Sequence, residues 1–188
     1  CIQRPETGRE LQYANISKTK LIKSILVAGG GPAGVKAACI AADRGHRVTL
    51  CEKSNSLGGQ INLAQSLPGR TEFGGIITNL NKELKKTTVN VRFNSFVNLD
   101  LIEELAPDVV VAATGAIPYV PEIQGSQDAH VVNAWQVLEG KANVGGSVVI
   151  ADWRCDWVGL GLAELLVKQG CHVRLAVNGM VAGQNIPQ

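Results

Sequence analysis

The chain has 188 residues, of which 45% are apolar and 18% charged, the balance of an ordinary soluble globular protein. Its net charge of +2 and its few aromatic residues (three Trp, two Tyr, three Phe) indicate neither nucleic-acid nor membrane-surface binding. No apolar run approaches the roughly 18 residues of a membrane span, and no secretory signal opens the chain, so we expect a cytoplasmic protein. The five cysteines form no C-x-x-C pair, which argues against a disulfide framework or a self-contained zinc site.

The first 22 residues are polar and keep neither a helical nor a strand period. We therefore predict that residues 1–22 are a linker arriving from an upstream domain. The chain also begins at Cys1 without a methionine and ends at Gln188 soon after a predicted strand. These ends lead us to expect a piece of a longer protein.

A strand–turn–helix–strand unit follows the linker. Residues 24–28 are a short β-rich run, residues 29–34 are a glycine turn, and residues 33–44 are alanine-rich and precede Gly45, a typical helix terminator. Residues 48–51 are the second strand. The strands are continuous apolar runs, which is typical of parallel strands that are buried on both faces.

The alternation of helices and strands continues through the first half. Apolar spacing predicts a helix over residues 76–84, a strand over 89–93 and a buried strand over 108–113. The pattern predicts an α/β fold of the Rossmann-like, doubly wound type, with flanking helices on a parallel sheet. Residues 23–120 form its first unit.

The second half is a fainter copy of the first. A strand at 148–150, a helix over 160–168 and a strand in 170–175 repeat the order, and residues 170–175 resemble residues 45–50. We therefore predict a second, incomplete unit of the NAD(P)-binding type over residues 121–188.

The glycine turn carries the sharpest chemical prediction. Gly29, Gly31 and Gly34 form a G-x-G-x-x-G pattern that follows a strand and opens a helix. The first glycine permits the tight turn, the second lets a pyrophosphate approach the backbone, and the third lets helix pack on strand. The phosphates would lie at the positive end of the helix. The alternative is a strand–helix turn that binds nothing.

Glu52 ends the second strand, roughly 20 residues beyond the glycine turn, where such folds place a ribose-binding carboxylate. A carboxylate accepts hydrogen bonds from a ribose diol and repels a 2′-phosphate. An adenosine without a 2′-phosphate is therefore favoured. The alternative is a solvated charge at a strand end.

The equivalent loop of the second half lacks the glycine pattern. Trp153 and Trp157 precede the first glycine, Gly159, and Val177 stands where the first unit has Glu52. We expect the indole rings to fill the space that a pyrophosphate needs, so this site is predicted to be degenerate or rebuilt.

Two residues of that loop have a functional and a structural interpretation. Arg154 could contact a phosphate, but Asp152 or Asp156 could instead hold it in a surface ion pair. Cys155 could be a reactive thiol or a packed one. We favour the ion pair and the packed thiol.

An ordered series of short motifs resembles the C-terminal region of the trimethylamine dehydrogenase and 2,4-dienoyl-CoA reductase family. The similarity covers nearly the whole chain. The series consists of the glycine loop, Glu52-Lys53, residues 57–64 (LGGQINLA), Pro68-Gly69-Arg70, and residues 108–115 ending in Ala113-Thr114-Gly115.

The resemblance implies a larger architecture. In that family an upstream TIM barrel carries FMN and the substrate site, a four-cysteine [4Fe-4S] cluster follows, and the nucleotide-binding region comes last. Cys1, with Gly8-Arg9-Glu10 after it, resembles the segment of the last cluster ligand. Cys1 is thus the expected metal ligand, and no catalytic residue is expected in this chain.

The resemblance also implies the remaining cofactor contacts. Besides the three motif glycines and Glu52, it adds nine residues to the predicted nucleotide site: Pro32, Ala33, Lys53, Gly59, Gln60, Val97, Ala113, Thr114 and Gly115. The ligand would be FAD or ADP, with FMN and [4Fe-4S] held by the full-length protein.

The family divides in function. Dienoyl-CoA reductase-like members bind FAD and NADPH, whereas trimethylamine dehydrogenase-like members keep only ADP and pass electrons to a flavoprotein. Because the second loop departs from the NADPH pattern, we favour oxidative N-demethylation of a methylated amine or amino acid. The alternatives are an NAD(P)H-dependent dienoyl-CoA or enoate reductase and a non-catalytic, structural ADP module. The expected partners are the upstream barrel and an electron-transfer flavoprotein or NAD(P)H, in a homo-oligomer.

Overall fold

The computed structural model describes residues 6–13 and 15–186, which form two compact units. Unit 1 comprises Cys1–Asn62 and Glu72–Ala116, and unit 2 comprises Leu63–Thr71 and Ile117–Gln188. In the described ranges no helix is both long and apolar enough to cross a membrane. Each unit is built around its own parallel strands.

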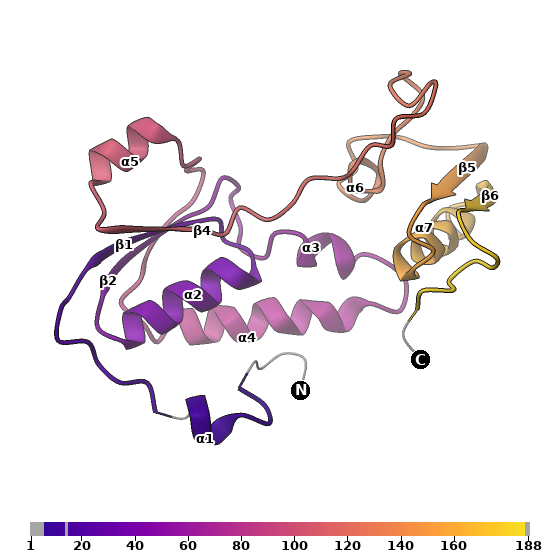
Figure 1. The fold of residues 1–188 in the computed structure, drawn as a ribbon. Helices are drawn as coiled ribbons and strands as arrows, with labels where there is room; N and C mark the ends of the chain where they lie inside the picture. Colours follow the sequence, from indigo (N-terminus) through magenta and orange to yellow (C-terminus); the bar gives the residue numbers. More distant parts are fainter. Residues whose placement is uncertain (1–5, 14, 187–188) are drawn as a thin grey trace. The chain divides into compact units, whose positions relative to one another are not determined.

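Unit 1 is a four-stranded parallel sheet with helices on its faces (Figure 1). The strand order is β3 (Asn90–Arg92), β2 (Arg47–Cys51), β1 (Ser24–Ala28) and β4 (Val109–Ala112). In register, Ile25 of β1 pairs with Val48 of β2 on one side and with Val109 of β4 on the other. This arrangement confirms the predicted α/β fold.

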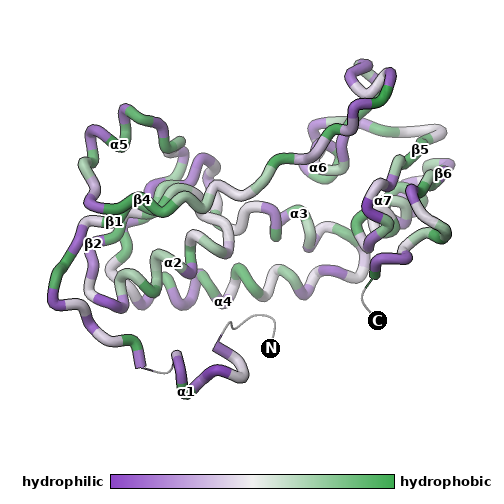
Figure 2. The backbone as a smooth tube through the Cα atoms, in the orientation of Figure 1, coloured by the Kyte–Doolittle hydropathy of each residue, from purple (hydrophilic) through white to green (hydrophobic). Residues whose placement is uncertain are grey.

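Helix α2 (Pro32–Asp43) covers the sheet with its apolar side. Its buried residues Val35, Ala38, Cys39 and Ala42 have the i, i+3, i+4, i+7 spacing of one helix face. Helix α4 (Gly74–Leu84) lies beside α2 and adds Leu80 and Leu84 to the same core. In Figure 2 the central strands are coloured as apolar, which places the core between them and these helices.

Unit 2 contains a two-stranded parallel sheet of β5 (Ser147–Asp152) and β6 (His172–Val177), with α7 (Trp157–Lys168) connecting them. Helix α6 (Ala134–Leu138) starts with a capping box between Asn133 and Gln136. Leu67, Leu162 and Leu166 form the buried centre of this unit. The strand–helix–strand repeat predicted for the second half is therefore present.

Several local predictions were wrong. The predicted linker, in which no helical period was recognised, contains a short helix, α1 (Glu10–Tyr13). Strand β4 alternates between half-buried and exposed residues, with Val110 exposed, because only one of its faces packs on the core. The sequence also gave no sign of α3 (Ile61–Ala64), the 3-10 turn η1 (Thr71–Phe73) or α5 (Leu99–Leu105), which are too short to establish a period.

Leu50 tests the core of unit 1. Its side chain is fully buried in β2, so Leu50→Ala should lower the free energy of unfolding by about 3 kcal/mol. Leu21→Ala removes the same atoms from a side chain that is 68% exposed, and should change stability by less than about 0.5 kcal/mol. Urea unfolding of both variants measures the difference. Equal losses would contradict this location of the core.

Candidate functional site

The glycine loop joins β1 to α2 in unit 1. Gly29 has a φ of +110°, which favours glycine, and its amide donates to the Cys51 carbonyl at 2.8 Å. A Cβ on Gly34 would collide with the Gly29 carbonyl oxygen, and a Cβ on Gly29 would collide with that of Ala113. The first and third motif glycines are therefore required by packing within the protein.

Gly31 is different. It is the N-cap of α2, with φ −71° and ψ 177°, a conformation open to any residue and suited to the position before Pro32. A Cβ at Gly31 would meet no protein atom within 4 Å. The space beside it lies at the positive end of α2, where helical amides lack partners within the helix. Packing gives no reason for a glycine here.

Glu52 is buried immediately after β2, and its carboxylate holds the loop. Oε2 accepts a hydrogen bond from the Gly30 amide at 2.7 Å. Oε1 accepts from the Ser54 amide at 2.8 Å and from the Ser54 hydroxyl at 2.7 Å. Burial raises the pKa of Glu52, but these hydrogen bonds outweigh it, so the pKa lies below the ordinary 4.5. Glu52 is therefore an oriented carboxylate, not the solvated strand-end charge.

Two further loops lie against the glycine loop. The Gly58 amide donates to the Gly30 carbonyl at 2.9 Å, and the Cβ position of Gly59 is 3.3 Å from the Gly31 Cα. The Ala113 amide donates to the Ala28 carbonyl at 2.8 Å. Three segments that are distant in sequence are thus brought to the carboxyl end of β1.

The other predicted nucleotide contacts are arranged around these loops. Gln60 Nε2 donates to the Ala116 carbonyl at 3.3 Å, which ties the second loop to the exposed segment with Thr114 and Gly115. Ala33, in the first turn of α2, and Lys53, next to Glu52, are exposed.

Val97 lies in the segment that follows β3. Val97 is half-buried between β3 and α5, in a segment joined to Glu52 by the Ser95 amide, which donates to the Glu52 carbonyl at 2.9 Å. Cys1 lies outside the described residues. Ser54 was missed by the sequence analysis, although a hydroxyl two residues after a carboxylate is a recognisable local partner.

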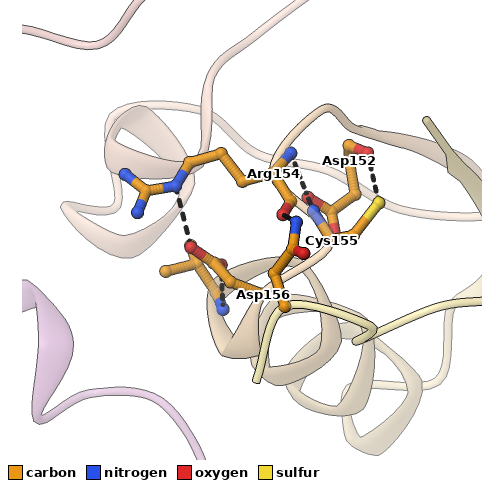
Figure 3. Close-up of polar contacts among 6 residues, drawn as sticks. Asp152, Arg154, Cys155 and Asp156 are labelled. Carbon is orange, nitrogen blue, oxygen red and sulfur yellow. Dashed lines mark hydrogen bonds and ion pairs between the residues drawn. The ribbon is translucent and has the colours of Figure 1, made fainter. Parts of the chain in front are cut away.

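The equivalent loop of unit 2 is closed by its own carboxylate (Figure 3). Asp152 is buried at the end of β5, and its Oδ1 accepts from the Arg154 amide at 3.1 Å and the Cys155 amide at 2.9 Å. Its Oδ2 lies over Gly159, where a Cβ would collide with it. Backbone donors at this loop therefore bind an internal anion.

This geometry corrects the sequence-based explanation of the altered loop. The group that occupies the loop is the Asp152 carboxylate, whereas the Trp153 indole is half-exposed and Trp157 packs against the core of unit 2. The two structural interpretations are supported: Arg154 Nε pairs with Asp156 Oδ2 at 2.8 Å, and Cys155 is a buried thiol. Asn185, which was not predicted, closes the loop by donating from Nδ2 to the Arg154 carbonyl at 2.7 Å.

The lowered pKa of Glu52 predicts a pH-dependent contribution to stability. A depressed folded-state pKa stabilises the fold above the unfolded value of 4.5, and this contribution is lost as the pH falls from 4.5 through the folded value. Glu52→Gln should cost about 1–3 kcal/mol at pH 7 and progressively less below pH 4.5. Urea unfolding between pH 7 and pH 3 measures this, with the exposed Glu103→Gln as control. A cost independent of pH would contradict the assignment.

Proteins of known function share this chain's sequence and fold. N,N-dimethylglycine/sarcosine dehydrogenase of Chromohalobacter salexigens is 35% identical, over 97% of this chain and 28% of that protein. An NADH oxidase of Thermoanaerobacter brockii is 36% identical, over 93% and 27%. The structure of 2-naphthoyl-CoA reductase with 2-naphthoyl-CoA superposes with a TM-score of 0.85 at 34% identity, over 93% and 26%. The chain spans about a quarter of these relatives' length.

A family model described as pyridine nucleotide-disulphide oxidoreductase matches residues 23–177. This range contains the glycine loop, Glu52 and the closed loop of unit 2. The relatives, which include both an amine-type dehydrogenase and a reductase, confirm the family resemblance drawn from the sequence. Because the match covers most of the chain and its glycine loop, the chain belongs to the pyridine nucleotide-disulphide oxidoreductase family.

Proposed function

We propose that residues 23–120 bind FAD or ADP within a flavin- and iron–sulphur-dependent oxidoreductase that oxidatively demethylates an N-methylated amine or amino acid. The observation that carries the proposal is the contrast between the two loops. The loop of unit 1 is open at Gly31, whereas Asp152 closes the loop of unit 2.

The open loop fits a pyrophosphate. Gly29 and Gly34 are fixed by contacts within the protein, but the absence of a side chain at Gly31 leaves space at the N-terminus of α2. A bound pyrophosphate would gain hydrogen bonds from backbone amides and the favourable field of the helix. Gly31 is thus best explained by a ligand.

Glu52 fits a ribose. A carboxylate has about four acceptor positions, and the Gly30 amide, the Ser54 amide and the Ser54 hydroxyl use three. One position remains for a ribose hydroxyl, whose orientation the fixed carboxylate would select. A 2′-phosphate would be repelled, since the lowered pKa keeps Glu52 ionised at neutral pH.

The closed loop argues against nicotinamide nucleotide in unit 2. A pyrophosphate there would have to displace the Asp152 carboxylate from the amides of Arg154 and Cys155 and would experience its charge. This supports the demethylating branch. The chain is also similar to a relative named N,N-dimethylglycine/sarcosine dehydrogenase. FAD, when bound, would supply a redox carrier, whereas ADP would supply only stability.

Substrate chemistry is proposed to occur outside this chain. By family resemblance an upstream barrel would carry FMN and the substrate, and Cys1 would complete a [4Fe-4S] cluster. The residues of this chain would bind and orient the nucleotide.

The NAD(P)H-dependent reductase remains a second candidate, since one relative is named NADH oxidase and one solved structure is a 2-naphthoyl-CoA reductase. It requires NADPH to bind unit 2 despite Asp152. A structural ADP module would instead bind ADP tightly, take up no FAD and show no redox activity.

The phosphate-loop assignment is tested at Gly31. Gly31→Val places a branched side chain in the space proposed for the pyrophosphate, and its Cβ would meet no protein atom within 4 Å. It should weaken FAD and ADP binding by at least about a hundredfold, equivalent to about 2.8 kcal/mol, with little change in melting temperature. Gly34→Ala is the control and should lower the melting temperature, because its Cβ collides with the Gly29 carbonyl. Unchanged nucleotide affinity in Gly31→Val would rule out the loop as the phosphate site.

Titration calorimetry with FAD, ADP and NADPH separates the candidate functions. By calorimetry we expect FAD or ADP to bind. In a parallel fluorescence titration, micromolar NADPH should cause no quenching of Trp153 or Trp157. Stoichiometric quenching by NADPH, retained in both Gly31→Val and Arg154→Gln, would favour the reductase and overturn the demethylase proposal. Tight ADP binding without FAD binding, together with no redox activity of the full-length protein, would favour the structural module.

A further inference from the structure

A pocket of side chains lies at the start of α7, wholly within unit 2. Its volume is about 470 Å³, within the range of small-molecule sites. The lining residues are Trp153, Arg154, Asp156, Trp157 and Asn185. The altered loop, which is closed to a pyrophosphate, therefore borders a pocket lined by aromatic and charged side chains.

The backbone beneath this pocket is held at several points. Asn185 donates from Nδ2 to the Arg154 carbonyl at 2.7 Å and from its amide to the Cys155 carbonyl at 3.0 Å. The Asp152 carboxylate binds the amides of the same two residues. The side chains of Trp153 and Arg154 thus project from a fixed frame, which lowers the entropy cost of binding.

Of the two charged residues that line the pocket, Arg154 is exposed and Asp156 is buried. Asp156 is buried, with Oδ1 accepting from the Val158 amide at 2.9 Å and Oδ2 paired with Arg154 Nε at 2.8 Å. The Arg154 side chain is 84% exposed, and Figure 3 shows its terminal nitrogens turned away from Asp156. The carboxylate therefore orients the guanidinium and leaves its outer N–H groups available to an anion.

The aromatic part of the pocket consists of two indoles. Trp153 is half-exposed, an uncommon state for so large an apolar side chain on a fixed loop. The Arg70 guanidinium lies over the Trp157 ring, with Cζ 5.1 Å from its centre, and covers one face of this indole. A cationic ligand would meet the exposed Arg154 guanidinium, whereas the Asp156 carboxylate is buried and already paired with Arg154.

We propose that this pocket binds a flat aromatic molecule that carries an acidic group. The aromatic ring stacks on the half-exposed indole of Trp153, beside Trp157 in the wall of the pocket, and the acidic group pairs with the outer N–H groups of Arg154. Nucleotide binding in unit 1 is not required for this site.

Benzoate is the probe, and the indole N–H signals of the ¹⁵N-labelled 188-residue chain are the readout. Benzoate should shift the signals of Trp153 and Trp157 but not that of Trp135, which lies on α6 and serves as internal reference. Benzylamine and cyclohexanecarboxylate should cause no shift, since the first lacks the acid and the second the flat ring. Arg154→Gln should weaken benzoate binding about tenfold, or about 1.4 kcal/mol. The exposed Arg174→Gln should not.

Three results would overturn the proposal. Benzoate could shift all three indole signals alike, which would indicate non-specific binding. Benzylamine could bind as well as benzoate, which would exclude charge recognition by Arg154. Arg154→Gln could bind benzoate with unchanged affinity while its Trp135 signal shows an intact unit.

Discussion

The close approach of Gly29 and Gly34 is the contact on which the first unit depends. The Gly29 carbonyl oxygen occupies the position that a Cβ of Gly34 would need, so the start of α2 lies directly on the end of β1. This contact directs the N-terminus of α2 to the carboxyl edge of the sheet, where ligands bind in open α/β folds. The apolar face of α2 then covers the strands. Both the fold and the candidate site therefore require the close contact between Gly29 and Gly34.

The two units differ in what lies next to the backbone N–H groups at the start of the helix that follows the first strand. A strand followed by a helix presents backbone N–H groups, which need an anion or water. In unit 1 the space beside Gly31 is open, which fits an external phosphate. In unit 2 the Asp152 carboxylate accepts from the Arg154 and Cys155 amides, so the anion is part of the chain. A single carboxylate therefore distinguishes the closed loop of unit 2 from the open loop of unit 1.

Glu52 links the stability of the glycine loop to the proposed specificity of the site for a ribose. The same hydrogen bonds that keep its pKa low also hold the Gly30 amide and orient the carboxylate. A carboxylate that is already oriented contributes more binding free energy to a matching ribose than a mobile surface carboxylate would. Its desolvation is compensated by hydrogen bonds before the ligand binds. Arg154 is oriented by Asp156 in a comparable manner at the edge of unit 2.

The sequence by itself determined the α/β class, the main strands and helices, and the glycine loop, because these depend on short-range apolar periods and on glycine geometry. Only the tertiary structure decided how residues 57–60 and 113–116 meet the loop, since that depends on parallel strand pairing across long separations. It also showed that Asp152, rather than the indoles, closes the second loop. A spacing of residues cannot tell which side chain turns inward, because packing and hydrogen bonding of the whole unit decide it.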